Sequence, residues 1–450
     1  MKIVHFAANY YPESAGGIES YLRDLTDAQR AAGIEPVLVT GSFEPHSRCE
    51  IVEHACDGLR HFRIHRDDWF TDRHMKSWHP EVEALVEELL GRLRPDLVHV
   101  HQWLYLTSNL VEIADRLGIP AVVTLHDLYT SCPRCFRVRP GDEACFRTLS
   151  VKSCFDCVPR YGHESERELA EGIELFRDQY RSELALARVV VCATATTAHL
   201  IAETTATPRE RFTVASLGYS RRFAGKAIAP APAGGPGVPF RCGYWGNLTH
   251  RKGTHVLLEA FRRLGQVALP RPVELHLFGR IDTQVLQAEL EGLAKGRPVT
   301  FHGRFSYDQL AAAGLHLAVF PMICFETFGF VLDEACELGL PSIVTGIGAL
   351  PERAGDAALV VPPNDAAALA DAIARIVADP VLLERMRGRL PQLPPEPGEH
   401  ARAVAALYAQ ALRTPRAVHA PRIPLLRRAA FLLQQRESAQ RKLTPPGGPV

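Results

Sequence analysis

The sequence lacks the features of several common protein classes. Its 51 Lys and Arg residues equal its 51 Asp and Glu residues, so no bulk charge would attract nucleic acid or a membrane. No apolar run is long enough to cross a bilayer, and the Asn-Tyr-Tyr-Pro stretch at 9–12 ends the first apolar segment too early for a signal peptide. No Gly-x-Gly-x-x-Gly follows an expected strand, which disfavours a dinucleotide oxidoreductase. We expect a cytoplasmic protein, with peripheral contact at the inner membrane face left open.

A disulfide framework is also not expected, because cytosolic thiols stay reduced. Five of the 11 cysteines nevertheless gather in one segment. Cys132 and Cys135 form one C-x2-C pair, Cys154 and Cys157 form a second, and Cys145 lies between them. This is zinc-ribbon spacing, and four thiolates suit a closed tetrahedral structural site. The alternative is a set of thiols that stay reduced or pair reversibly.

Short apolar segments alternate with helical patterns in two successive series. This alternation predicts buried parallel strands covered by helices, and hence two doubly wound α/β domains. Strands are expected over residues 2–8, 35–40, 97–101, 121–125 and 189–193, and then over 241–245, 273–278, 299–302, 315–320 and 342–345. Helices are expected over 18–32, 81–93, 254–264 and 366–378.

The length of 450 residues exceeds that of one usual domain. The first domain is expected over 1–217, with a cysteine-rich insert at 132–157, and the second over 240–392. A linker rich in Ala, Pro and Gly is expected between them, over 218–239. Ligands of such sheets bind beyond the carboxyl ends of the strands, which places the expected site between the domains.

The basic tail at 416–450 follows a further expected helix at 393–415. In the tail, apolar residues alternate with arginines. This pattern allows an amphipathic helix that touches a membrane, or a solvated and partly disordered extension.

Two glutamates, Glu326 and Glu334, stand eight positions apart around a turn that runs into a helix. Thr327 is expected to cap this helix, and Gly339 with Pro341 is expected to end it. A capped helix start next to two carboxylates has the parts of a nucleotide-sugar site.

The backbone N–H groups near Phe328 and Gly329 would favour an anion such as a diphosphate. Glu326 and Glu334 would then accept hydrogen bonds from sugar hydroxyls on either side of it. A surface carboxylate and a favourable helix charge are the plainer interpretations of the two glutamates taken alone.

This segment resembles the Glu-x7-Glu motif of the family 4 retaining glycosyltransferases. Four more segments resemble family motifs and occur in the family's order: a glycine loop at 16–19, a strand segment at 94–101, a histidine segment at 124–127 and a basic loop at 251–253. The resemblance covers residues 1 to about 390. It implies the GT-B fold, with two Rossmann-like domains facing each other across a cleft, and a last helix that packs back on the first domain.

The resemblance also implies the reaction. A sugar would move, with retention, from a UDP- or GDP-linked donor bound mainly by the C-terminal domain. The acceptor would be a glycan or lipid-linked saccharide bound mainly by the N-terminal domain. Attack would occur from the front face, with a donor phosphate oxygen taking the acceptor proton, so no protein nucleophile is expected.

The leaving diphosphate needs positive charge as it departs. No two aspartates have the Asp-x-Asp spacing that holds a metal, so no cofactor is expected for the chemistry and Lys252 is the expected cation. By resemblance, His126 would contact the donor sugar and Glu326 its hydroxyls, with Asp127 orienting the His126 ring. These expected catalytic residues are Glu326, His126 and Lys252.

The expected donor-binding residues are Gly16, Gly17, Asn247, Arg251, Lys252, Thr327, Phe328, Gly329 and Glu334. Asn247 stands where the family often carries an arginine, which leaves Lys252 with less cationic support. The loop at 346–352 is a further candidate for the nucleotide pocket. Tight turns and solvated loops are the plainer interpretations of the glycine pair and of the basic pair.

Two other functions remain open. A nucleotide-sugar epimerase on the same fold would need acid and base groups placed to abstract a sugar proton. A non-catalytic sugar-nucleotide or partner-binding module would use the cysteine cluster as its interaction element. No nucleic-acid partner is expected.

Overall fold

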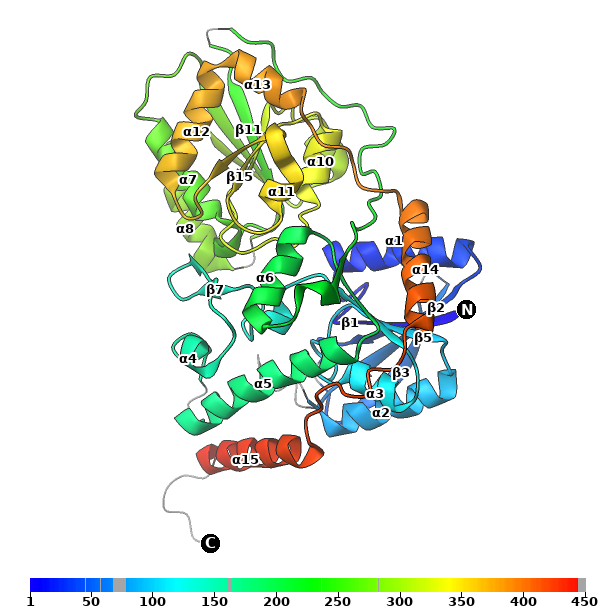
Figure 1. Ribbon diagram of the computed structural model, residues 1–450. Helices are drawn as coiled ribbons and strands as arrows, with labels where there is room; N and C mark the ends of the chain where they lie inside the picture. Colours follow the sequence, from blue (N-terminus) through cyan, green and yellow to red (C-terminus); the bar gives the residue numbers. More distant parts are fainter. Residues whose placement is uncertain are drawn as a thin grey trace. The chain divides into compact units, whose positions relative to one another are not determined.

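The computed structural model describes residues 1–44, 46–56, 58–67, 78–160, 164–235, 237–281 and 283–443. It contains two compact units (Figure 1). Unit 1 comprises Met1–Phe136, Phe146–Gly218 and Pro397–Val450, and unit 2 comprises Arg137–Cys145 and Tyr219–Glu396.

Unit 1 is built on an eight-stranded sheet of order β10-β9-β6-β5-β1-β2-β4-β3. Its strands are parallel except β3, which pairs antiparallel with β4. Central strands such as β5 and β6 are buried throughout, which is why they read as continuous Val- and Leu-rich runs. The strands are β1 (Lys2–Ala7), β2 (Glu35–Gly41), β3 (Glu50–Cys56), β4 (Leu59–His65), β5 (Leu97–Val100), β6 (Ala121–Leu125), β9 (Val189–Cys192) and β10 (Phe212–Val214).

The helices of unit 1 include the C-terminal α14, which contacts α1 in this unit. They are α1 (Gly17–Ala31), α2 (Pro80–Leu93), α3 (Leu110–Arg116), η1 (Tyr129–Ser131), α4 (Val151–Cys154), α5 (Glu166–Leu186), α6 (Ala195–Thr205), η2 (Arg209–Arg211), α14 (Pro397–Arg413) and α15 (Leu425–Leu443).

Unit 2 contains a six-stranded parallel sheet of order β13-β12-β11-β14-β15-β16. Counted along the chain this is the order 3-2-1-4-5-6 of a Rossmann sheet, whose ligand crevice lies where the order reverses, here between β11 and β14. The strands are β11 (Phe240–Trp245), β12 (Val273–Phe278), β13 (Val299–Gly303), β14 (Leu317–Phe320), β15 (Ser342–Thr345) and β16 (Ala358–Val361), with a separate hairpin of β7 (Val138–Arg139) and β8 (Glu143–Ala144).

The hairpin β7–β8 belongs to unit 2 although its flanking residues belong to unit 1. Val138 explains this, because its side chain is buried in the hydrophobic core of unit 2. The helices of unit 2 are η3 (His250–Lys252), α7 (Thr254–Leu264), α8 (Gln284–Ala294), α9 (Tyr307–Ala311), α10 (Val331–Glu337), α11 (Leu350–Ala354), η4 (Gly355–Ala357), α12 (Ala366–Ala378) and α13 (Pro380–Arg387).

The expected α/β class with two doubly wound parallel sheets is confirmed. The expected strands 121–125, 273–278 and 342–345 and helices 254–264 and 366–378 have the observed bounds. The sequence pattern does not predict β3 and β4. β4 is buried but carries the polar residues His61, Arg63 and His65, so it is not an apolar run, and β3 lies at the sheet edge and is only partly buried.

The segment expected as a linker, 218–239, lies along unit 2 from Tyr219 onward. A Pro-rich chain has few N–H donors, but its carbonyls still accept hydrogen bonds. Arg271 donates to the carbonyl of Val238 at 2.9 Å, and His316 contacts that of Pro232 at 3.0 Å.

The basic tail is not a solvated extension in its described part. Residues Leu425–Leu443 form α15, which lies along α5 (Figure 1). Phe431 is buried against Leu175 of α5, and Arg428 forms an ion pair with Glu112 of α3. Packing supplied by the helices of unit 1 therefore orders a segment whose composition alone allowed disorder. Membrane contact through the tail stays a prediction.

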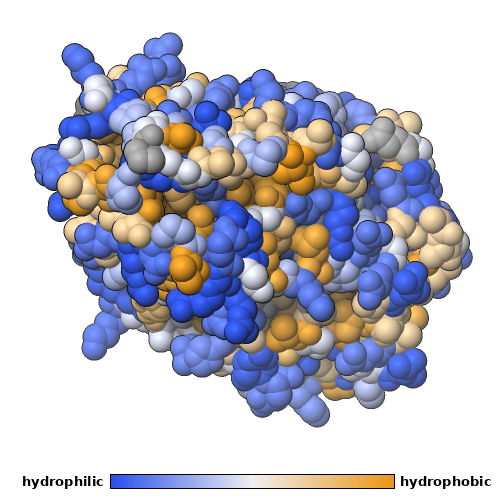
Figure 2. All heavy atoms as spheres, turned by 90° about the horizontal axis from the view of Figure 1, so that it is seen from above, coloured by the Kyte–Doolittle hydropathy of each residue, from blue (hydrophilic) through white to orange (hydrophobic). Residues whose placement is uncertain are grey.

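In the described residues no helix is long and apolar enough to cross a membrane. The face shown in Figure 2 is mostly hydrophilic, and its apolar residues lie in separate groups among hydrophilic ones. Single exposed apolar residues of this kind are normal on folded proteins.

Candidate functional site

Two loops of unit 2 meet where the strand order reverses. The first follows β11, and Thr249 accepts a hydrogen bond from the N–H of Lys252 at 3.3 Å to shape its η3 turn. The second follows β14, and its residues Ile323 and Cys324 donate N–H hydrogen bonds to the carbonyl of Arg251 at 2.9 and 3.1 Å. The backbone thus ties the basic loop to the segment that leads to Glu326.

Gly253 makes this close approach sterically feasible. Its φ is +71°, and a Cβ there would lie 1.8 Å from the carbonyl oxygen of Pro321. Any side chain would push the basic loop away from the segment after β14.

Lys252 forms an ion pair with Glu326 in this corner. The two side chains are 31% and 18% exposed, so the pair is partly open to solvent. Burial by itself would lower the pKa of Lys252, but the Glu326 carboxylate outweighs it and raises that pKa above its usual value. Two of the three expected catalytic residues therefore meet, with the lysine charged.

The loop expected at 346–352 packs directly on Glu326. The N–H of Ala349 donates to the carbonyl oxygen of Glu326 at 2.7 Å. Gly348 has φ +66°, and a Cβ there would lie 2.6 Å from the same oxygen. This loop holds the backbone of Glu326 from the side of β15.

The expected cap by Thr327 is wrong. Helix α10 begins at Val331, and its N-cap position is Phe330, which makes no side-chain cap hydrogen bond. Gly329 has φ +81°, a left-handed conformation that keeps residues before it out of the helix. The N–H groups expected near Phe328 and Gly329 therefore belong to a turn that precedes the helix.

The expected end of the same helix is confirmed. Gly339 has φ +70°, and its N–H donates to the carbonyl of Cys336 at 3.0 Å. The N–H of Leu340 donates to the carbonyl of Ala335 at 2.9 Å, which completes a Schellman motif ahead of Pro341.

Arg353 of α11 braces this turn, and no sequence motif indicates this role. Its guanidinium donates to the carbonyls of Phe328 and Gly329 at 3.1 Å each and to Asp333 at 2.6 Å. Its Cζ also lies 3.6 Å from the centre of the Phe328 ring. No spacing in the sequence links Arg353 to the turn, so only the tertiary structure reveals its role.

Glu334 lies on α10, where its carboxylate is buried. It accepts hydrogen bonds from Trp245 Nε1 at 2.7 Å and from the Tyr307 hydroxyl at 2.9 Å. Burial raises its pKa to about 7, despite these two donors. Trp245 ends β11, so Glu334 is also held at the strand-order reversal, and its contact with a ribose stays a prediction. Asn247, two residues after Trp245, is exposed.

In unit 1, His126 follows β6, as expected, and its pKa is lowered to about 3 by burial. The Asp127 carboxylate accepts hydrogen bonds from the Tyr129 N–H at 2.9 Å and from the Gln102 side chain. Its expected role in orienting the His126 ring stays a prediction. The ring of His126 is hydrogen-bonded by His101, with 2.9 Å between Nε2 and Nδ1.

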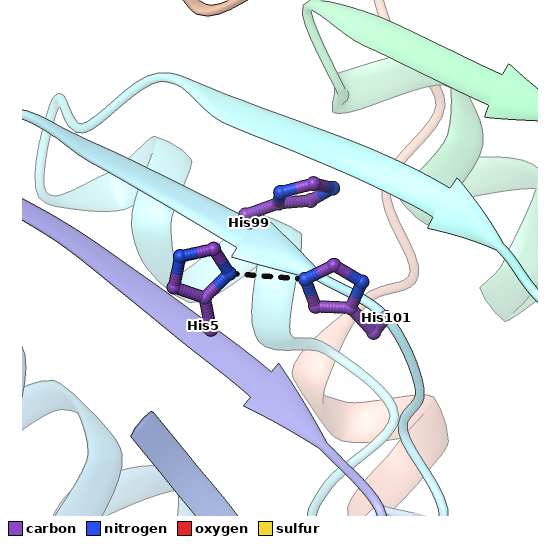
Figure 3. A group of neighbouring side chains, drawn as sticks. All are labelled: His5, His99 and His101. Atoms are coloured by element: carbon purple, nitrogen blue, oxygen red, sulfur yellow. Dashed lines mark hydrogen bonds between the residues drawn. The ribbon is translucent and has the colours of Figure 1, made fainter. Parts of the chain in front are cut away.

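A chain of buried side chains extends this contact. His101 is hydrogen-bonded to His5 at 3.0 Å (Figure 3), and His5 to Gln29 at 2.9 Å. Because the Gln29 oxygen accepts, His5 donates from Nε2, and His101 and His126 each donate from Nε2 to the next ring. Burial lowers the pKa values of His5, His101 and His126, so these three hydrogen-bonded rings are neutral.

His99, beside them in Figure 3, is hydrogen-bonded to the Tyr408 hydroxyl and to Thr124, both at 2.8 Å. The ring nitrogens of His5 and His99 are thus all engaged by protein groups. The three clustered histidines form a hydrogen-bonded network that supports His126, and they do not need a metal to satisfy them.

The glycine pair also lies in unit 1, before and at the start of α1. Gly16 has an extended backbone, which any residue could adopt. The absence of a side chain matters because a Cβ there would lie 2.8 Å from Oε2 of Glu19. Glu19 folds back over the loop and accepts a hydrogen bond from Ser14. Gly17 is the first residue of α1.

The two C-x2-C pairs form tight turns in unit 1. The N–H of Cys135 donates to the carbonyl of Cys132 at 2.8 Å, and that of Cys157 to the carbonyl of Cys154 at 3.0 Å. Arg134, inside the first turn, donates to the carbonyl of Cys157 at 2.9 Å, so the turns are neighbours. Zinc binding by these four cysteines stays a prediction.

Two family sequence models match the chain. The model described as Glycosyltransferase Family 4 matches residues 15–221. The model described as Glycosyl transferases group 1 matches residues 239–379, the segment that carries Lys252, Glu326 and Glu334.

Individual proteins are similar to the chain as well. The phosphatidyl-myo-inositol mannosyltransferase of Mycobacterium leprae is 35% identical over 139 residues, covering 30% of this chain and 36% of that protein. The D-inositol 3-phosphate glycosyltransferase of an Arthrobacter species is 24% identical over 384 residues, covering 81% and 83%. The structure of sucrose-phosphate synthase from Thermosynechococcus elongatus matches with a TM-score of 0.57 at 20% identity, covering 97% of this chain and 99% of that one, a likeness of fold.

Proposed function

The chain is a member of the family 4, group 1 glycosyltransferases, enzymes that use nucleotide-sugar donors, and on this premise we propose that it transfers the sugar with retention to a glycan or lipid-linked saccharide, without a metal. The observation that carries the proposal is the ion pair of Lys252 and Glu326 at the strand-order reversal of unit 2.

Lys252 acts on the leaving group. Without donor its charge is balanced by Glu326. A diphosphate at the same corner would offer two negative charges to the ammonium group and draw it from the single carboxylate. Lys252 would then stabilise the charge that develops as the glycosidic bond breaks, which is the role a metal plays in other transferases.

Glu326 acts on the sugar once Lys252 has turned to the phosphates. Its backbone is fixed by Ala349 and its loop by the Arg353 contacts with Phe328 and Gly329. A carboxylate fixed in this way can accept hydrogen bonds from two sugar hydroxyls and place the anomeric carbon. Glu334, held by Trp245, is proposed to bind the ribose.

His126 is proposed to contact the donor sugar. Its ring is neutral and fixed by His101, which leaves Nδ1 as the acceptor nitrogen. A neutral ring beside the developing positive charge avoids the repulsion that a protonated histidine would add. Front-face attack, with a donor phosphate oxygen taking the acceptor proton, then needs no protein base.

A donor and acceptor panel tests the proposal. Nucleotide release is measured with UDP- and GDP-linked sugars, with and without oligosaccharide, lipid-linked and inositol-containing acceptors, the last because two relatives carry inositol in their names. Release that requires an acceptor, an axial-to-axial or equatorial-to-equatorial product by NMR, and full activity in EDTA are expected. Donor conversion without acceptor would indicate an epimerase instead.

We also propose that Cys132, Cys135, Cys154 and Cys157 bind one structural zinc ion. The support is the contact of Arg134 with Cys157, which places the two turns side by side. The purified protein should contain about one equivalent of zinc that is lost in Cys154→Ser. Equal zinc contents in both proteins would refute this assignment.

A further inference from the structure

Three side chains of unit 2 converge from separate segments of the chain. Asp142 lies at the turn of the β7–β8 hairpin, where it has φ +58°. His250 begins the η3 turn, and His255 lies in the first turn of α7. One nitrogen or oxygen from each of the three lies within 4.8 Å of the others.

The three groups do not satisfy one another. The Asp142 carboxylate lies 3.6 Å from His250 Nδ1 and 4.0 Å from His255 Nε2, both beyond hydrogen-bond distance. No hydrogen bond to this carboxylate is found among the described residues, and the two imidazole nitrogens that approach it are both outside bonding distance. Two imidazole nitrogens and one carboxylate oxygen that lie close together without hydrogen-bonding to one another leave space for a cation.

The spacing suits a transition metal. Tetrahedral zinc has bonds of about 2.0–2.2 Å to nitrogen and oxygen, which separates its ligand atoms by roughly 3.3–3.5 Å. The observed 3.6 and 4.0 Å need only a small contraction to reach that geometry. Two imidazoles and one carboxylate favour zinc over magnesium or calcium, which prefer oxygen ligands.

A fourth residue orients one ligand. Glu289 of α8 lies 3.0 Å from Nε2 of His250, on the ring edge opposite Asp142. A carboxylate on this nitrogen keeps its proton there and leaves Nδ1 with a lone pair, the second-shell arrangement usual for metal-binding histidines.

We propose that Asp142, His250 and His255 bind one zinc ion or a similar divalent transition-metal ion, with Glu289 orienting His250 and water completing the coordination. The ion would fasten the tip of the β7–β8 hairpin to the loop that carries Lys252, which is two residues after His250. This site is separate from the four cysteines, and it does not depend on the proposed transfer reaction.

Metal binding by the full-length protein tests the site directly. The protein is stripped with EDTA and titrated with Co²⁺ and Zn²⁺, and bound metal is counted by mass spectrometry for the wild type, D142N, H255A and C154S. H199A is the matched control, because His199 is an exposed histidine 3.1 Å from Glu203 without a second imidazole.

We expect D142N and H255A each to lose about one equivalent that H199A keeps. The cobalt absorption that disappears in D142N and H255A should contain no thiolate-to-metal charge-transfer band. The absorption that disappears in C154S should contain such a band. The thermal midpoint of the wild type should rise with metal more than that of D142N. Asp142 lies at a partly exposed turn, so D142N tests the site even if H255A fails to fold. Equal metal contents in the wild type, D142N and H199A, or loss in C154S alone, would overturn the proposal.

Discussion

Lys252 donates a hydrogen bond to the carboxylate of Glu326, although 74 positions separate them in the sequence. They meet because β11 and β14 are neighbours in the sheet and both loops leave its carboxyl edge. The strand order therefore places the Lys252 ammonium group beside the Glu326 carboxylate. A bound donor must compete with Glu326 for Lys252, so substitutions of this pair test the proposed site.

Loss of either partner should affect turnover more than folding. Lys252→Ala and Glu326→Gln should each lower kcat by about 100-fold or more, because one charge contact to the transition state is removed. Lys226→Ala is the matched control, since Lys226 is a lysine of the same unit that pairs with a different carboxylate, Asp308, at 2.9 Å. Near-normal steady-state rates for both site variants would contradict the assignment.

Gly253 should be intolerant of a side chain. Gly253→Ala and Gly296→Ala both force alanine into φ +71°, which costs about 1 kcal/mol in each. Only at position 253 does the added Cβ meet a backbone oxygen, whereas position 296 is open. Urea unfolding should show roughly 2 kcal/mol more destabilisation for Gly253→Ala. Equal destabilisation by the two substitutions would mean that the basic loop can shift away from Pro321 at no cost in stability.

Arg353 should act as a positioning residue. Arg353→Ala leaves the buried Asp333 without its partner and frees the carbonyls of Phe328 and Gly329, which should cost about 3 kcal/mol. Arg353→Lys keeps the charge but not the planar guanidinium. It should therefore recover part of the stability lost in Arg353→Ala, while its donor KM stays further from the wild-type value. The donor KM and the thermal midpoint are the measurements. An unchanged donor KM and thermal midpoint in Arg353→Ala would show that the turn at Phe328 and Gly329 keeps its conformation without Arg353.

Glu334 should make stability depend on pH. Its pKa of about 7 in the folded protein lies above the usual 4.5, so the folded state binds the proton more tightly than the unfolded state. The stabilisation is complete below pH 4.5 and is lost as pH rises to 7. Relative to the wild type, Glu334→Gln should therefore gain about 3 kcal/mol across that window, measured by urea unfolding at several pH values. A difference that does not change with pH would show an ordinary pKa.

Arg428 should hold the C-terminal helix to unit 1. Arg428→Ala leaves the Glu112 carboxylate buried without its partner and should cost about 3 kcal/mol. Arg436→Ala, on the exposed side of α15, should cost less than about 0.5 kcal/mol. Limited proteolysis should release α15 from the first variant only. Equal resistance in both would mean that Phe431 alone anchors the helix.

Much of the architecture could be predicted because it depends on neighbours along the chain. Valine-rich runs such as 121–125 predict buried strands wherever they pack, and Gly339 with Pro341 predicts a helix end from backbone preference alone. The same local reasoning failed at Thr327. A threonine is a good cap in isolation, but the left-handed Gly329 delays the helix to Val331.

The site divides in the same way. The sequence by itself determined which chemical groups are present, since Glu326, Lys252 and His126 lie after apolar runs that become strands. Only the tertiary structure decided what those groups contact. It paired Lys252 with Glu326, supported His126 by His101, and brought Asp142 to His250. The reason is physical: local periodicity dictates each strand and helix, whereas contacts between distant residues depend on the strand order and on close approaches, such as that of Gly253 to Pro321, which no local pattern encodes.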